Sequence, residues 1–205
     1  TGGGNIYNTA VGYAAGNLIT TGAQNAIVGG LAADALTTGG LNVAFGLHAL
    51  GGDTAGSKST ALGYSALLTQ NFTSATDTFN TAVGFEAGSA VQTGVQNTLM
   101  GGLAGGAMTT GSRNTFMGIG AGSAGVVTGN DNTAVGASTG ANITSGSNLM
   151  CLGHDAGLSG SPGGAFTTGS NALVLGDENI AACHIQTDWT VASDQRDKTD
   201  FTALD

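Results

Sequence analysis

The segment NTAVGFEAGSAVQTGVQ, residues 80–96, decides the fold of this chain. A related segment, NTLMGGLAGGAMTTGSR, follows directly at residues 97–113, and further copies recur through most of the 205 residues. Each copy has an Asn-Thr-apolar-apolar-Gly burst, a variable spacer, and Thr-Thr-Gly or a looser variant ahead of the next burst. Self-similarity at a short period is typical of solenoids, in which successive repeats stack on one another.

The glycine that closes each burst sets the period. Consecutive closing glycines lie 17, 17, 17, 21, 17, 17, 18, 17 and 23 residues apart, which gives ten copies of one unit. The two long steps fit loop insertions around residues 70–77 and 159–166, between the bursts and not within them. The closing glycines are Gly12, Gly29, Gly46, Gly63, Gly84, Gly101, Gly118, Gly136, Gly153 and Gly176.

Each apolar burst predicts a short β-strand, because it is bounded by glycine, is too short for a helix and favours Val, Ile, Leu, Phe and Met. Gly and Asn tolerate left-handed backbone conformations, so they predict the corners of a coil. A unit of this length cannot bury its own apolar face and must stack on its neighbours, about 4.8 Å apart. We therefore expect an all-β fold, a parallel β-solenoid or β-roll of ten coils of about 17 residues, across residues 1–176.

The asparagine at the start of each burst is expected to stack at one corner of the coil, since its side chain can cap its own turn and bond the copy above. The asparagines predicted to stack are Asn8, Asn25, Asn42, Asn80, Asn97, Asn114, Asn132, Asn148 and Asn171.

Most bursts are apolar at two adjacent positions, as in Ala82/Val83 and Leu99/Met100. Because neighbouring residues of a strand point to opposite faces, both faces of the sheet are expected to be buried. A slender coil has one interior, so the second face is expected to meet another chain. This pattern predicts a closed, cyclic homo-oligomer packed along its length.

Composition and charge exclude several classes of function. The formal net charge is −9, hydrophobic residues make up 40% of the chain, and 38 residues are Gly. The four basic residues form no stripe that could neutralise phosphates or anionic lipid, which argues against nucleic-acid and membrane-surface binding. No apolar run approaches the length of a membrane span, and the hydrophobic content argues against disorder. The chain begins at Thr1 without a basic-then-apolar leader, so no targeting segment is expected.

The composition changes near Asp177, since residues 1–176 contain eight charged residues and the much shorter segment 177–205 contains nine. Within that segment, IQTDWTVASDQRDKTDF (185–201) resembles the start of the intramolecular chaperone domain of phage tail spikes and tail fibres of the endosialidase type. The Ser-Asp-x-Arg-x-Lys marker of this family is intact at residues 193–198. The repeats resemble the head repeats of trimeric autotransporter adhesins and the stalks that precede this chaperone in phage fibres.

The resemblance implies a homotrimeric rod in which residues 1–176 form a phage tail-fibre shaft and residues 177–205 form a junction and the start of the chaperone domain. It implies a virion, extracellular location and a role in host attachment. The implied partners are other virion tail proteins and a host cell-surface receptor or glycan. A bacterial surface adhesin or an ice-binding solenoid with a threonine ladder is the alternative, although insertions of four and six residues interrupt the register of such a ladder.

The resemblance also implies self-cleavage by a serine-lysine mechanism. Ser193 would be the nucleophile, Lys198 the base that takes its proton, and the bond between Ala192 and Ser193 the scissile bond. Only 13 residues follow Ala192, fewer than a full chaperone domain, so the 205-residue chain is expected not to cut itself. The alternative for residues 193–198 is a solvated polar tail.

The histidines and cysteines of the chain are expected to be structural. His48 and His154 follow closing glycines and are expected at solvated corners, without a carboxylate at recurring spacing. His184 lies in an unlike setting near the C-terminus. Cys151 occupies an apolar strand position, and Cys183 is expected to be a similar small residue at the junction.

The acidic residues of the shaft do not form a recurring site. The aspartates at positions 34, 53, 77, 131 and 155 occupy different places in the unit, which argues against a calcium-binding β-roll. Glu86 has no second carboxylate within its own repeat after the strand, so no local pair indicates glycoside hydrolysis. The glycine-rich stretch 101–106 lacks a following Lys-Thr or Lys-Ser and is expected to be a solenoid corner, not a phosphate loop. No metal ion or cofactor is expected.

Overall fold

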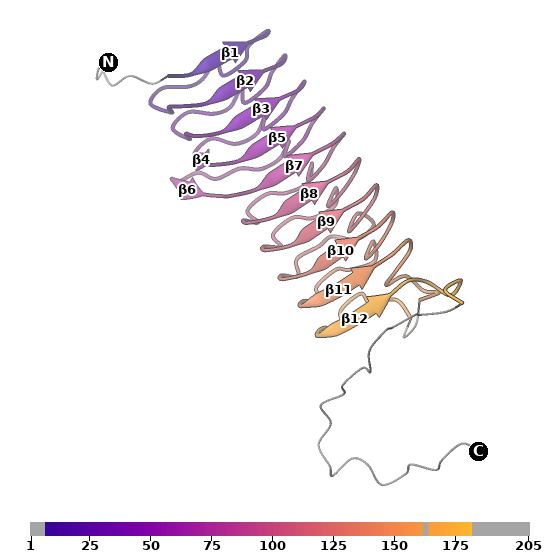
Figure 1. Ribbon diagram of the computed structural model, residues 1–205. Coiled ribbons are helices and arrows are strands. Elements are labelled where there is room, and N and C mark those ends of the chain that lie inside the picture. Colours follow the sequence, from indigo (N-terminus) through magenta and orange to yellow (C-terminus); the bar gives the residue numbers. More distant parts are fainter. Residues whose placement is uncertain (1–6, 162–163, 182–205) are drawn as a thin grey trace, which may run out of the picture.

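The described residues form an all-β, parallel solenoid. A computed structural model describes residues 7–161 and 164–181, and these contain no helix. Ten strands, one from each repeat, lie side by side in one parallel sheet that runs along the rod (Figure 1), in the order β1-β2-β3-β5-β7-β8-β9-β10-β11-β12. A second, two-stranded sheet pairs β4 with β6. The predicted parallel solenoid is therefore confirmed.

The ten strands of the long sheet have three or four residues each, as short as the bursts that predicted them, whereas the two-residue strands β4 and β6 lie outside the bursts and were not predicted. Their bounds are β1 (Thr9–Val11), β2 (Ala26–Val28), β3 (Val43–Phe45), β4 (Gly56–Ser57), β5 (Thr60–Leu62), β6 (Thr76–Asp77), β7 (Thr81–Val83), β8 (Thr98–Met100), β9 (Thr115–Met117), β10 (Thr133–Val135), β11 (Leu149–Leu152) and β12 (Ala172–Leu175).

The strands stack in register, repeat on repeat. Val11 of β1 pairs with Val28 of β2, and Val28 pairs with Phe45 of β3. The ladder continues past the strand end, because the N–H of Gly29 donates to the carbonyl of Val11 at 2.8 Å. The closing glycines of successive repeats are therefore neighbours, as predicted.

Close backbone packing explains why these positions are glycine. Gly101 has a φ of +130°, and a Cβ added to it would lie 2.6 Å from the carbonyl oxygen of Gly118 in the next coil. The adjacent Gly102 has no other atom within 4 Å of such a Cβ. Only the first of these two glycines is required by the stack.

Buried asparagines join each coil to the next. Oδ1 of Asn97 accepts the backbone N–H of Asn114 in the following coil at 2.9 Å, and Nδ2 donates to the carbonyl of Gly111 at 2.9 Å. The N–H of Asn97 in turn donates to Oδ1 of Asn80 at 2.9 Å. We call this column the asparagine ladder; its asparagines are Asn8, Asn25, Asn42, Asn80, Asn97, Asn114 and Asn132.

The predicted stack is wrong for Asn148 and Asn171. In the register of the sheet, Leu149 takes the ladder position, and its N–H donates to Oδ1 of Asn132 at 3.0 Å. Asn148 and Asn171 stand one residue earlier and are exposed, with a 2.8 Å hydrogen bond between their side chains. The last two bursts are one residue longer than the others, so their asparagines are displaced outward from the ladder position.

One coil replaces the ladder with a buried polar cluster. We call it the Asp53 cluster; it contains Asp53, Ser59, Gln70, Thr78 and Asn80, all with 0–1% exposed surface. Nε2 of Gln70 donates to Asp53 at 2.6 Å and to Oγ of Ser59 at 2.8 Å, and Oε1 accepts Nδ2 of Asn80 at 2.8 Å. The hydroxyls of Ser59 and Thr78 are 2.6 Å apart. Ser59 stands where a typical repeat has asparagine, and Gln70 and Thr78 supply hydrogen-bond partners for its hydroxyl beside the first insertion.

Residues other than Gly and Asn form many of the corners, which the sequence did not predict. The residue before each ladder position has left-handed φ, for example +60° at Gln96 and +59° at Arg113. Their N–H groups donate to Thr78 and Val95 of the preceding coil at 2.7 and 2.9 Å, which offsets the cost of this conformation. None of these residues is β-branched. We call this column the left-handed corner; its residues are Tyr7, Gln24, Leu41, Lys58, Phe79, Gln96, Arg113, Asp131, Asn148 and Asn171.

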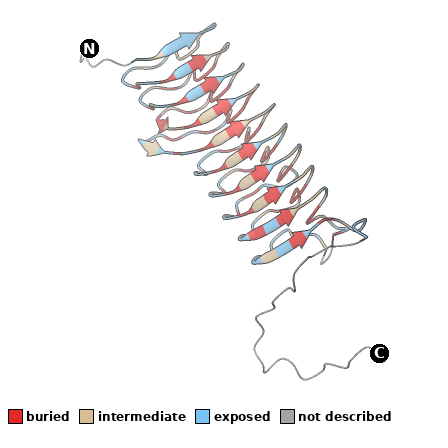
Figure 2. Cartoon of the chain, in the orientation of Figure 1, coloured by how far each residue is buried: buried red, intermediate tan, exposed pale blue. Residues whose placement is uncertain are grey.

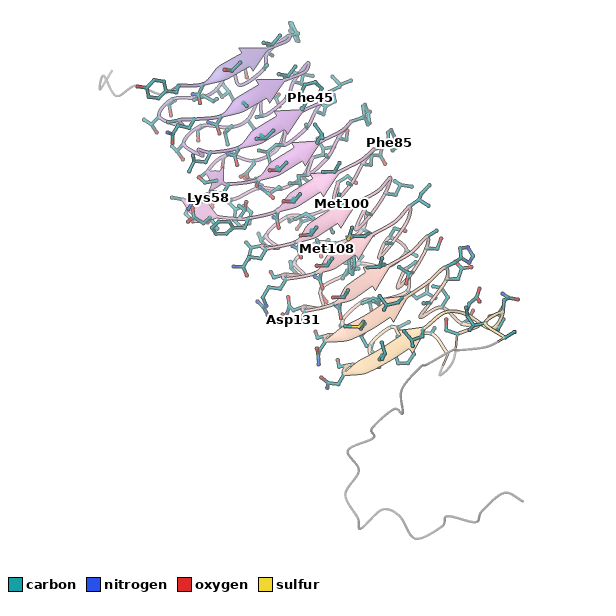
Figure 3. All side chains as sticks on the ribbon, viewed as in Figure 1. Phe45, Lys58, Phe85, Met100, Met108 and Asp131 are labelled. Carbon is teal, nitrogen blue, oxygen red and sulfur yellow. The ribbon has the colours of Figure 1, made fainter. Side chains whose placement is uncertain are left out.

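In each of the three-residue strands from β2 to β10 the central residue is buried inside the coil, and the residues beside it are partly or fully exposed (Figure 2). In β8, Leu99 is fully buried and Met100 is 40% exposed; in β9, Phe116 and Met117 repeat this division. Buried residues of the turns, such as Met108, complete the core (Figure 3).

A pair of adjacent glycine substitutions tests the packing between coils. Gly101→Ala is expected to lower the free energy of unfolding by at least about 2 kcal/mol, because the new Cβ meets backbone and the φ is unfavourable. Gly102→Ala, in open space, is expected to leave stability unchanged or to raise it by about 0.4–1 kcal/mol. Urea unfolding followed by circular dichroism measures both, and equal losses in the two variants would contradict the packing argument.

A second pair tests the asparagine ladder. Asn97→Leu is expected to lower the free energy of unfolding by about 2–4 kcal/mol, because it leaves the N–H of Asn114 and the carbonyl of Gly111 buried without partners. Asn148→Ala removes an exposed side chain outside the ladder and is expected to cost about 1 kcal/mol, mainly from its left-handed conformation. Thermal and urea unfolding measure the difference, and a larger loss for Asn148→Ala would contradict the ladder.

Candidate functional site

The outward side of the ten-stranded sheet is the most extensive candidate interaction surface. We call it the outer sheet face; it comprises the residues on either side of the buried central residue of each strand, bordered by the residue after each closing glycine. Its exposed large apolar side chains are Val11, Tyr13, Val43, Phe45, Leu47, Leu62, Tyr64, Phe85, Met100, Met117, Ile119, Val135, Met150, Leu173 and Leu175.

Large side chains on this face are well exposed in the single chain. Phe45 and Phe85 have more than half of their surface exposed and project from the coils (Figure 3). The ring of Phe85 stacks on that of Tyr64 from the preceding coil, with centroids 5.2 Å apart. Soluble monomers rarely expose contiguous apolar surface over such a length, so the outer sheet face has the character of an interface.

The outer sheet face carries no charged residue from β1 to β11. The part of the chain that the structure describes has one lysine and one arginine, Lys58 and Arg113, and both lie on the left-handed corner instead. Lys58 pairs with Asp77 at 2.6 Å and lies 5.1 Å above the ring of Phe79. Arg113 donates to both carboxylate oxygens of Asp131, at 2.6 and 2.9 Å; these hydrogen bonds lower the pKa of Asp131 and raise that of Arg113. The charged side chains thus lie at the corner, whereas the outer sheet face from β1 to β11 is uncharged, with large apolar side chains beside the threonines that begin six of its strands.

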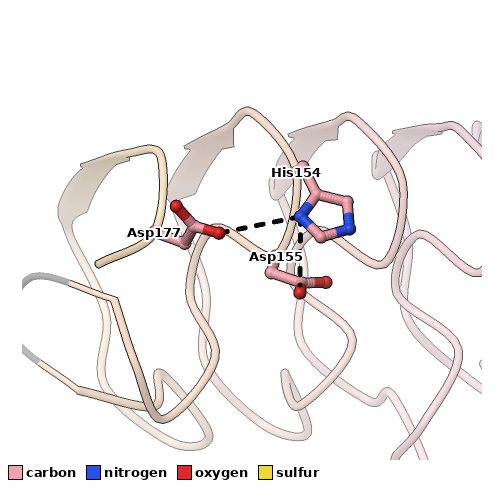
Figure 4. A group of neighbouring side chains, drawn as sticks. All are labelled: His154, Asp155 and Asp177. Carbon is pink, nitrogen blue, oxygen red and sulfur yellow. Dashed lines mark ion pairs between the residues drawn. The ribbon is translucent and has the colours of Figure 1, made fainter. Parts of the chain in front are cut away.

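A second candidate site lies at the C-terminal end of the solenoid (Figure 4). Nδ1 of His154 lies 3.4 Å from Oδ2 of Asp155 and 3.7 Å from Oδ2 of Asp177. The side-chain and backbone amides of Asn179 donate to Asp177, and together with the nearby His154 they hold the pKa of this carboxyl below its ordinary value. A hollow of about 430 Å³ adjoins these side chains and is also lined by Leu158, Ser159, Gly160 and Glu178.

The sequence predicted His154 at a solvated corner, which is confirmed, but it did not predict that two carboxylates lie beside this histidine. Asp177 comes from the next repeat, and the stacking brings it beside His154. The sequence contained the information to predict this contact, since His154 and Asp177 directly follow the closing glycines of successive repeats, Gly153 and Gly176.

The other singled-out residues of the shaft have structural positions. His48 is half-buried at a corner with φ of +60°, as expected. Cys151 is fully buried in β11, the strand next to the C-terminal end of the sheet, and burial raises the pKa of its thiol, which suits a core residue. Asp34 and Glu86 are half-buried on the turns, and the glycine-rich stretch 101–106 forms a turn of the coil as predicted.

The residues to which the resemblance gives a catalytic role, Ser193 and Lys198 with Ala192 before them, lie outside the described residues. His184 and Cys183 lie outside them as well. Their roles stay predictions.

The threonines before the Thr-Thr-Gly glycines form an incomplete column. The hydroxyls of Thr20 and Thr37 donate to backbone carbonyls of the next coil at 3.1 and 2.8 Å. The outward neighbours Thr21 and Thr38 are exposed, but the same position of the following repeat is the buried Ala55. This column therefore lacks the unbroken register of a flat ice-binding face.

Within residues 7–161 and 164–181, no helix has the length and hydropathy of a membrane span. Comparison of the chain with models of protein families, with curated proteins and with solved structures found no match.

Proposed function

We propose that this chain is the shaft of a homotrimeric fibre, a structural virion protein of the phage tail-fibre type that takes part in host attachment. The observation that carries the oligomer is the row of exposed apolar side chains on the outer sheet face, which has no charged residue from β1 to β11. The number three and the tail-fibre assignment rest on the resemblance of the repeats to fibre stalks and of residues 193–198 to the chaperone marker. On this proposal the protein is extracellular as part of the virion and contacts other tail proteins and a host receptor or glycan.

The solenoid suits this role because every coil is tied to the next along the rod axis. Strand ladders, asparagine ladder and close glycine contacts recur at each step, so the rod is stiff over its described length. Packing three such rods through their outer sheet faces would remove the exposed apolar surface from water and leave the charged left-handed corner in solvent. A bacterial surface adhesin would use the same shaft, so the fibre proposal covers the mechanical role in both settings.

The oligomer is tested by charging the outer sheet face. Val83→Asp and Met100→Asp are each expected to dissociate the trimer or prevent its assembly, because a carboxylate would be stranded in an apolar interface. Both side chains point away from the coil interior, so the single chain should keep its far-UV circular dichroism spectrum. Thr110→Asp, an exposed change away from this face, is the matched control and should remain trimeric.

Light scattering coupled to size-exclusion chromatography measures the outcome. The wild-type chain and Thr110→Asp are expected at three times the 19.8 kDa mass of one chain. A stable wild-type monomer at micromolar concentration would overturn the proposal.

The self-cleavage proposal needs a chain that continues past Asp205 through a complete chaperone domain. Such a chain is expected to release a fragment ending at Ala192. Ser193→Ala should block release by removing the nucleophile, and Lys198→Ala by removing its base. The 205-residue chain serves as the control and should stay intact. Mass spectrometry after trimerisation distinguishes the outcomes, and an extended wild-type chain that stays full length would leave residues 193–198 without a protease role.

A further inference from the structure

We propose that His154, Asp155 and Asp177 form a binding site for a divalent transition-metal cation of the zinc class at the C-terminal end of the solenoid (Figure 4). All three donors come from one chain, and His154 and Asp177 border the outer sheet face because they follow the closing glycines of the last two coils.

The spacing of the donor atoms fits a small metal ion. One imidazole nitrogen and two carboxylate oxygens lie within 4.8 Å of one another, with Nδ1 of His154 at 3.4 and 3.7 Å from the two oxygens. Bonds of about 2.1 Å to a tetrahedral ion place the ligand atoms about 3.4 Å apart. The three donors need only small side-chain movements to reach that arrangement.

The backbone of the solenoid positions the donors. His154 and Asp177 occupy the same place in successive coils, and stacking sets their separation. Asp155 has a left-handed φ of +54°, and its N–H donates to the carbonyl of Ala137 in the preceding coil at 3.0 Å. Asn179 holds the Asp177 carboxylate through two hydrogen bonds, of 2.9 and 3.1 Å. Such outer hydrogen bonds orient ligands at metal sites.

The local charge favours a cation. Asp155, Asp177 and Glu178 contribute three carboxylates around the hollow, whereas His154 is the single group there that can become positive. Lys58 and Arg113, the lysine and arginine of the described chain, belong to other coils and are already paired. The hollow is open to solvent, which gives an ion a path to the three donors and room for a bound water or for Glu178 as a further ligand.

The donor chemistry selects the class of ion. Calcium and magnesium prefer oxygen ligands alone, whereas an imidazole nitrogen with carboxylates suits zinc and its neighbours. His154 is therefore the residue that separates the proposed site from a general acidic patch.

The probe is ZnCl₂, titrated calorimetrically into the full 205-residue chain in metal-free buffer. Wild type is expected to bind one equivalent per chain at this site, and the thermal unfolding midpoint is expected to rise with zinc. His154→Ala and Asp177→Asn are each expected to weaken zinc binding at least about tenfold. The His154 side chain is exposed, so the unfolding midpoint of His154→Ala without zinc should stay at the wild-type value. Asp177 is largely buried and accepts two hydrogen bonds from Asn179, so Asp177→Asn is chosen because it keeps the size of the side chain, and its midpoint without zinc is measured alongside.

His48→Ala is the matched control, since it removes a corner histidine in another coil and should bind zinc as wild type does. Zinc affinity unchanged in His154→Ala would overturn the proposal, because the ion would then sit on other residues. Calcium binding as tight as zinc binding, and insensitive to His154→Ala, would overturn it as well, because the hollow would then act as a carboxylate patch.

Discussion

The side-chain oxygen of each buried asparagine in the ladder has its hydrogen-bond donor in the next coil, and this dependence governs the whole structure. Oδ1 of Asn97 accepts the backbone N–H of Asn114 in the next coil. Without that donor, the buried oxygen would have no hydrogen bond, which would lower the stability of the fold. The strands must therefore stay in register from coil to coil, whereas the number of residues between strands can vary, as in the longer step that contains β6. The same constraint brings the backbones of adjacent coils so close together that Gly101 has no room for a side chain. The asparagine ladder and the recurring closing glycines both follow from the close spacing of successive coils.

The parts of the fold that depend on this spacing were readable from the sequence, because close contact admits few residue types. Glycine at Gly101 and asparagine at Asn97 recur for that reason, and they predicted the strands and their parallel stacking. The left-handed corner was not readable, since its conformation is held by backbone hydrogen bonds and accepts residues as different as Gln96 and Arg113. The displacement of Asn148 from the ladder was missed because one additional residue in a burst looks like an extension of the strand. The site at His154 was missed because its second carboxylate comes from another coil.

Inside and outside of the coil are under different constraints. The ladder asparagines and the closing glycines recur in most coils, whereas the exterior columns differ in character: the outer sheet face carries apolar side chains and threonines without charge from β1 to β11, the left-handed corner carries the ion pairs, and the threonine column is polar but interrupted. In such a rod, the interior residues hold the coils together and the exterior residues determine the chemistry of the surface. Changing an exterior residue such as Met100 leaves the ladder intact, so contact with other chains and contact with solvent can be tuned without altering the backbone. This separation supports the proposed role of a shaft that assembles through one side.

A chain of near-identical repeats also has an alignment problem. The same five residues, NTAVG, occur at 8–12, 80–84 and 132–136, so looping out one repeat and restacking the rest would preserve most strand pairs. The Asp53 cluster is not interchangeable in this way. A shift of one coil would move Gln70 and Phe72 away from Asp53, so the buried carboxylate would lose two of its three hydrogen-bond donors and keep the N–H of Gly56, at considerable cost. In the observed alignment the buried side-chain polar atoms of the described chain all have partners. The irregular coil thus fixes the alignment of the repeats, because stacking them one coil out of place would break its buried hydrogen bonds.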